Sequence, residues 1–148
     1  MNLIKSLGIS ASGLSAERLR MDVISSNIAN ANSTQTVRGG PYRRRVAILA
    51  PQKNAASFKN VLRDSLQNTP PYSGVRVASI IEDSSPLKRV YDPEHPHASA
   101  DGYVEYPNVD VMKEMVELIT ASRAYEANIT SLNSTKNMFL KTLEIGRA

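Results

Sequence analysis

Cysteine and tryptophan are absent from this 148-residue sequence, and only 5% of its residues are aromatic. The absence of cysteine excludes disulfides and thiolate metal sites. Because large aromatic side chains fill many protein cores, their scarcity argues against a large compact core. The length suits one ordinary domain, or one small domain that carries extended helical arms.

Long apolar runs are lacking as well. No window approaches the roughly 20 apolar residues that a helix needs to span a bilayer. Serine and glycine interrupt the apolar residues of positions 1–9, and the uninterrupted apolar region of a secretory signal does not follow. We therefore expect neither Sec-dependent export nor direct membrane insertion.

The net charge of +4 is not gathered in one segment. Residues 1–40 carry four basic and two acidic groups, residues 41–107 nine and seven, and residues 108–148 five and five. Such a thin spread argues against nucleic-acid binding as the main function. The consecutive Arg43, Arg44 and Arg45 would alternate between the two faces of a strand, which favours a solvated or interface strand over a basic patch.

Residues 108–143 show the three–four spacing of apolar residues that is typical of a helix with one seam facing a partner helix. At 1.5 Å per residue such a helix would be about 50 Å long, and it needs another helix to bury its apolar stripe. Ser122 and Lys136 are polar positions within the seam. The apolar seam positions are Val111, Met115, Leu118, Tyr125, Ile129, Leu132, Phe139 and Leu143.

The first thirty residues repeat this spacing and predict a second helix. Gly8 and Gly13 weaken its early turns by up to about 1 kcal/mol each relative to alanine, so the helix would depend on packing for its stability. An ordinary amphipathic helix on a globular core is the alternative interpretation. The apolar positions of the stripe are Ile4, Leu7, Leu14, Met21, Ile24 and Ile28.

Between the helices the pattern predicts short strands. A polar loop at residues 29–36 and the Gly39–Gly40–Pro41 break lead to strands at 42–50, 75–81, 87–91 and 102–106. Residues 51–74 are ambiguous, with a short helix possible around 58–66. Asn108 is expected to cap the last helix. The predicted class is α+β: a helical arm at 1–35, a small β-rich middle domain at 36–107, and a long helix at 108–148 that pairs with the first as a coiled coil.

We find no arrangement of residues that predicts catalysis or cofactor binding. The sequence has no Gly-x-Ser-x-Gly elbow, no phosphate-binding glycine loop followed by lysine, and no dinucleotide fingerprint. His95 and His97, with nearby acidic residues, could form a metal site, but their proline-rich loop favours turn capping or contact with a neighbour. We therefore expect no enzyme activity, no cofactor and no metal.

Several separated motifs resemble one known family. They are SSNIANANS at residues 25–33, PYRR at 41–44, GVRV at 74–77, DPEHP at 92–96, YVEYPNVD at 103–110, MV at 115–116, SRAYEAN at 122–128 and LKTL at 140–143. This set resembles the bacterial flagellar axial proteins, and among them the subunits of the proximal rod of the basal body. The resemblance covers nearly the whole chain, apart from the Gly39–Pro41 loop and residues 51–74.

The resemblance implies a structural role. Such proteins are exported by the flagellar type III apparatus without a cleaved signal, and they polymerise in the periplasm into the rod through paired terminal helices. It implies as partners further copies, other rod proteins, the adaptor between rod base and MS ring, and the export apparatus, with no nucleic acid. Asn27 and Asn30 of the first motif join the two apolar stripes as assembly residues.

Two other function classes remain open at this point. A small basic nucleic-acid-binding protein would use Arg43–Arg45 and would bind with strong salt dependence. A secreted coiled-coil docking protein would need a soluble partner and no polymer.

Overall fold

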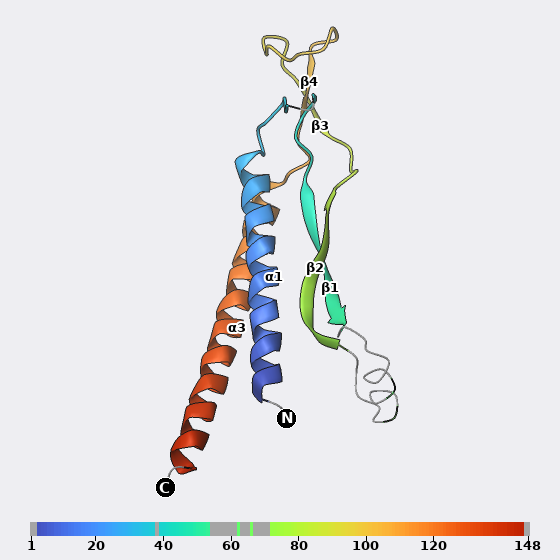
Figure 1. The fold of residues 1–148 in the computed structure, drawn as a ribbon. Coiled ribbons are helices and arrows are strands. Elements are labelled where there is room, and N and C mark those ends of the chain that lie inside the picture. The colour runs from blue at the N-terminus through green and yellow to red at the C-terminus, as the bar shows by residue number, and fades with distance from the viewer. Residues whose placement is uncertain (1–2, 38, 54–61, 63–65, 67–71, 147–148) are drawn as a thin grey trace. The chain divides into compact units, whose positions relative to one another are not determined.

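The computed structural model describes residues 3–37, 39–53, 62, 66 and 72–146. In chain order they form helix α1 (Leu3–Ala29), strands β1 (Arg45–Lys53), β2 (Tyr72–Glu82), β3 (Lys88–Tyr91) and β4 (Tyr103–Tyr106), and helix α3 (Val111–Ile145) (Figure 1). The predicted α+β class, with helices towards both ends and small sheets between them, is confirmed. The short helix that the sequence made possible around residues 58–66 falls largely outside the described residues.

The strands form two small sheets. β1 pairs with β2, and β3 pairs with β4 in antiparallel register. In the second sheet Arg89 stands opposite Glu105, and the two side chains form an ion pair at 3.5 Å. The rings of Tyr91 and Tyr103, also opposite each other, meet edge to face with centroids 5.3 Å apart, a favourable aromatic geometry.

Several predicted element boundaries are wrong; β1 and β2, for example, extend to Lys53 and from Tyr72. Two other boundaries differ for reasons that hydrogen bonds explain. The first strand begins at Arg45 and not at residue 42: before it, the amide of Tyr42 donates to the Ser33 carbonyl and the amide of Arg44 to the Asn108 side chain, not to a neighbouring strand. The last helix begins at Val111, and Asp110 rather than Asn108 caps it: the Asp110 carboxylate accepts hydrogen bonds from the amides of Met112 and Lys113. Carboxylates are favoured at this position because they satisfy free amides of the first turn.

The chain divides into two compact units. Unit 1 comprises Met1–Arg18, Leu49–Ala78 and Arg123–Ala148, and unit 2 comprises Leu19–Ile48 and Ser79–Ser122. Both helices therefore contribute a segment to each unit. In unit 1 the buried apolar residue is Ala16, whereas unit 2 holds the rest of the described apolar core: Val23, Ile24, Tyr42, Val104, Val109 and Ala121.

Candidate assembly interface

Within each unit, the segments of α1 and α3 lie side by side. In unit 1 they approach closely at Gly13, where an added Cβ would lie 3.1 Å from the side-chain amide atoms of Asn128. In unit 2 the amide of Asn27 donates to Glu114 Oε2 at 2.8 Å. The helices pack on each other through small and polar residues at these two places.

Asn27 is the centre of the contact in unit 2. Its side chain is 0% exposed, yet each of its polar atoms is paired. The Nδ2 amide donates to Glu114 and to the carbonyl of Arg45, and Oδ1 accepts from the Tyr42 hydroxyl at 3.0 Å and from the Arg45 amide at 2.9 Å. An asparagine side chain offers two donor hydrogens and two acceptor positions, so its hydrogen-bonding capacity is fully used. It joins the end of α1 to the start of β1 and to α3.

Arg44 supplies the opposite charge for Glu114, which is 1% exposed. The Nε atom of Arg44 donates to Glu114 Oε1 at 2.6 Å, and its Nη2 atom donates to Glu117 at 3.1 Å. Burial lowers the pKa of Arg44, but the hydrogen bond with Glu114 and the charges of Glu114, Glu117 and Asp83 together raise it above its usual value. Arg44 therefore stays charged. We call Asn27, Tyr42, Arg44 and Glu114 the buried polar cluster.

Asp83 and Asn108 support this cluster from the connecting segments. The side-chain amide of Asn108 donates to the carbonyls of Asp83 and Ser85, while its oxygen accepts from the Arg44 amide. Hydrogen bonds from the hydroxyl and the amide of Ser85 lower the pKa of the Asp83 carboxyl, and the charge of Arg44 lowers it further. Asp83 is thus held as an anion near the Arg44 guanidinium, whose Nη1 lies 3.9 Å from it.

The predicted interface residues of α1 differ in how far they are buried. Ile24 and Asn27 are buried, and Asn30 donates to the Ser26 carbonyl near the helix end. The side chain of Ile4 lies outside the described part of the structure. The half-buried members are Leu7, Leu14, Met21, Ile28 and Asn30. Their role in assembly stays a prediction.

On α3 the stripe that faces inward runs partly along different residues from the predicted seam. Glu114 and Ala121 are buried, and Asn128 and Thr135 are half-buried, each one position before a predicted seam residue. Lys136 is exposed, and its neighbour Thr135 is the half-buried residue at this point of the helix. The predicted positions Val111, Leu118, Tyr125 and Leu132 are half-buried, whereas Met115, Ile129, Phe139 and Leu143 are exposed. As assembly residues, these eight remain predictions.

Sequence reasoning missed Glu114 and Ala121. A glutamate in a first helical turn is ordinarily explained by the helix dipole, and an alanine carries little periodicity signal. One signal was available: Arg44 lies in a run of three arginines, and a buried cation calls for an acidic partner elsewhere in the chain. Because Arg44 is bound in this cluster, the three arginines do not form a free basic patch.

The histidines take part in local contacts. The amide of His97 donates to His95 Nδ1 at 3.1 Å, and the His97 ring lies 3.0 Å from the Thr34 hydroxyl, which agrees with the turn-capping interpretation. Over the described residues, no group of three or more histidine or acidic side chains is placed to hold a metal ion. Nor do α1 and α3, as far as they are described, contain a segment long and apolar enough to cross a bilayer.

Two family models match the chain. The model of the flagella basal body rod protein matches residues 7–35, which include most of α1, and the model of the flagellar basal body rod FlgEFG protein C-terminal region matches residues 100–145, which include β4 and α3. The segments that form the helix pair are therefore the segments that these models recognise.

Curated relatives match over nearly their full length. The flagellar basal-body rod protein FlgC of Borreliella burgdorferi is 49% identical over 149 residues, covering 98% of each chain. FlgC of Bacillus subtilis is 47% identical, over 99% of this chain and 100% of the relative, and FlgC of Salmonella typhimurium is 43% identical with the same coverage. The resemblance inferred from the motifs is confirmed, and with it a structural rod protein rather than an enzyme. The chain belongs to the FlgC family of flagellar basal-body rod proteins.

Proposed function

We propose that this structural rod subunit of the flagellum serves in the proximal rod, and that it polymerises through its two terminal helices, paired as a coiled coil. The observation that carries the proposal is the exposed apolar surface of α3. Met115, Ile129, Phe139 and Leu143 recur at seam spacing and yet remain in contact with solvent in the single chain. A free subunit exposes them, and an assembled one can bury them.

The association energy would come from burial of these side chains, at about 25 cal/mol per Å² of apolar surface. Contacts between two different surfaces of the same chain do not close on themselves and so generate a helical polymer. A rod is such a polymer. We propose the arms at 1–35 and 108–148 as the polymerising parts, and residues 36–107 as the domain between them.

The chain assembles with rod components of the basal body, as its family does. We propose more narrowly that its neighbours include further copies, other proximal and distal rod proteins and the adaptor at the MS ring. We also propose that it reaches the periplasm through the flagellar type III apparatus without a cleaved signal. The membership of the chain in a family of flagellar rod proteins supports this route.

The first test is the composition of isolated basal bodies. The chain is expected to co-purify with the rod, and a strain that lacks it is expected to stop assembly before the distal rod. Normal rods in the deletion strain would refute the proposed role.

A second test addresses the helix seam. We expect Leu118→Asp or Leu132→Asp to block incorporation into rods, because each places a charge where the helices pack. Thr130→Asp is the matched control, since Thr130 is exposed on the same helix and lies outside the seam. Normal rods with Leu118→Asp and Leu132→Asp would contradict the seam assignment.

A further inference from the structure

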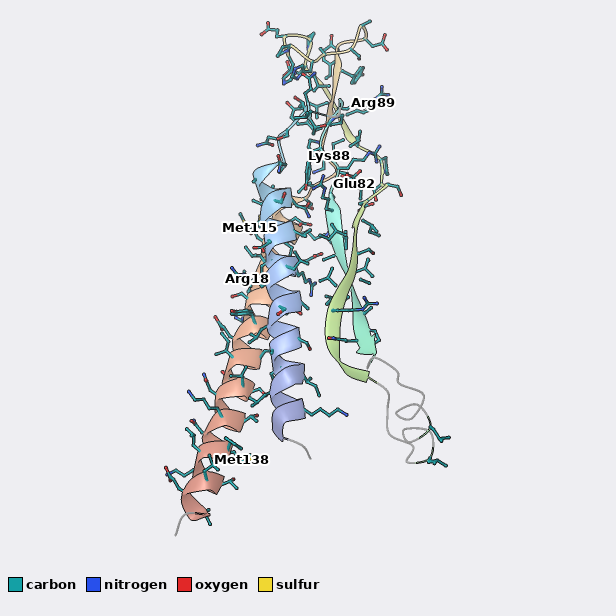
Figure 2. All side chains as sticks on the ribbon, in the orientation of Figure 1. Arg18, Glu82, Lys88, Arg89, Met115 and Met138 are labelled. Atoms are coloured by element: carbon teal, nitrogen blue, oxygen red, sulfur yellow. The ribbon has the colours of Figure 1, made fainter. Side chains whose placement is uncertain are left out.

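Helix α3 carries a second apolar surface in unit 2, on the side opposite its buried residues. Met112, Met115, Val116 and Ile119 follow the spacing of one helix face, and they are 46–72% exposed. Met115 is labelled near the start of α3 in Figure 2. We call these four residues the outer stripe. Contiguous exposed apolar side chains of this kind mark interaction sites in soluble proteins.

The outer stripe continues into a groove of unit 2. Met112 is one wall of this groove, which has a volume of about 390 Å³ and is also lined by Val90 and Tyr106. One cation, Lys88, and one anion, Asp110, belong to its lining. The stripe and the groove together offer an apolar surface with balanced charge.

The other end of α3 exposes a broad apolar surface beside one charged side. Its last turns carry five large apolar side chains that are 43–78% exposed: Met138, Phe139, Leu140, Leu143 and Ile145. A broad apolar face on a helix is normally packed against another element. Its charged pair, Lys141 and Glu144, is already joined at 2.8 Å. We call Met138–Ile145 the α3 tail.

The α3 tail extends past α1 within unit 1. Because Gly13 faces Asn128 in this antiparallel pair, the tenth residue before Gly13, Leu3, comes opposite the tenth residue after Asn128, Met138. Leu3 is where α1 begins, and α3 continues beyond it (Figure 1). Among the described residues, α1 therefore offers the tail no partner beyond this point.

We propose that the α3 tail of one copy docks on the outer stripe and groove of a second copy. A second copy is favoured because Phe139 and Leu143 continue the face of α3 on which Asn128 meets Gly13 of α1 and on which Leu132 and Thr135 are half-buried. That face is thus already shaped to pack on a helix, and the outer stripe is a helix face. Each surface carries one cation and one anion, so contact between them brings no net like charges together.

This inference rests on the proposed function and deepens it. The tail and the outer stripe are different surfaces of one helix, so their contact is heterologous and repeats from copy to copy. It names the two surfaces that would join successive copies within the rod.

The absence of cysteine in the chain allows a direct cross-linking test. Val116→Cys and Leu140→Cys are introduced into one full-length chain, and isolated basal bodies are oxidised. The two positions are 24 residues apart on one helix and therefore about 36 Å apart, far beyond the reach of a disulfide. A bond between them can therefore join only two chains. We expect dimers and longer multimers on a non-reducing gel, with monomers from either single variant and from the control pair Val116→Cys with Glu126→Cys.

Incorporated chains that stay monomeric, or that cross-link only to a different rod protein, would overturn the proposal. A strain in which even the native chain is absent from basal bodies would instead refute the proposed function. Charge exchange provides an independent measurement: Ile119→Lys and Leu143→Glu are each expected to lower incorporation at least tenfold, and the two together to restore it. Failure of the double variant to recover would also overturn the proposal.

Discussion

Replacing Glu114 with alanine should be among the most destabilising single changes in unit 2. The carboxylate is 1% exposed and accepts hydrogen bonds from Arg44 Nε and Asn27 Nδ2. Without it, the Arg44 guanidinium, whose side chain is 14% exposed, stays largely buried without its main counter-charge. Breaking such a pair costs about 3–5 kcal/mol, a large share of the roughly 5–15 kcal/mol that stabilises a typical domain.

The free energy of unfolding can be measured by urea titration of the full chain, followed by helical circular dichroism. Glu117→Ala is the matched control because Glu117 contacts the same arginine from the same helix but is 29% exposed. It should cost about 0.2–1 kcal/mol. The combined change Arg44→Met with Glu114→Leu should recover most of the loss, since an apolar pair leaves no buried charge. Equal effects of the two alanine variants would refute the reasoning.

Three further predictions concern local structure. In a urea titration, Gly74→Ala should lower the free energy of unfolding by about 1–3 kcal/mol. Gly74 has a φ of 122°, and a Cβ added there would overlap the side chain of Ser12 in α1. Gly8→Ala is the control and should be neutral or stabilising, because no atom lies within 4 Å of a Cβ added at Gly8. Ser85→Ala should raise the pKa of Asp83 in an NMR titration. The lowered pKa of Asp83 stabilises the folded chain at a pH above the pKa of the unfolded state, and this stabilisation is lost as the pH falls through the pKa of the folded state. The variant lacks part of this stabilisation, so its stability should fall less on acidification. In the free subunit, amides of residues 1–30 and 110–145 should exchange more rapidly than in the rod, because assembly adds contacts to helices that the buried polar cluster joins in the single chain. Equal protection in the two states would contradict this expectation.

The helices and the small strands could be predicted from the sequence because their signals are local. Three–four spacing of apolar residues indicates a helix wherever its partner lies, and the short alternating runs ending at Tyr91 and Tyr106 coincide with β3 and β4. Boundaries were less accurate where a long-range contact competes. The side chain of Asn108 looks like a helix cap, but it binds the backbone around Arg44 and Asp83, and the next acid along the chain caps the helix.

The inner face of α3 could be predicted only in part. Hydrophobicity selects Met115 over Glu114 as a seam position, and the regular heptad spacing then selects Lys136 over Thr135. The structure buries Glu114 because Arg44 and Asn27, from distant segments, satisfy its carboxylate. A single sequence carries no direct record of that three-part contact. The exposed apolar positions, in contrast, follow from the pattern once the inner face is known.

The sequence separation within the buried polar cluster has a consequence for the time course of folding. Asn27 and Glu114 are 87 residues apart, so a chain that appears N-terminus first presents one long before the other. At synthesis rates of about 5–20 residues per second, the delay is about 4–17 s. During that interval α1 is a lone helix of marginal stability, and closing so long a loop is slow. The pairing of α1 with α3 can therefore begin only after about three quarters of the chain has emerged, and α1 lacks its partner helix until then.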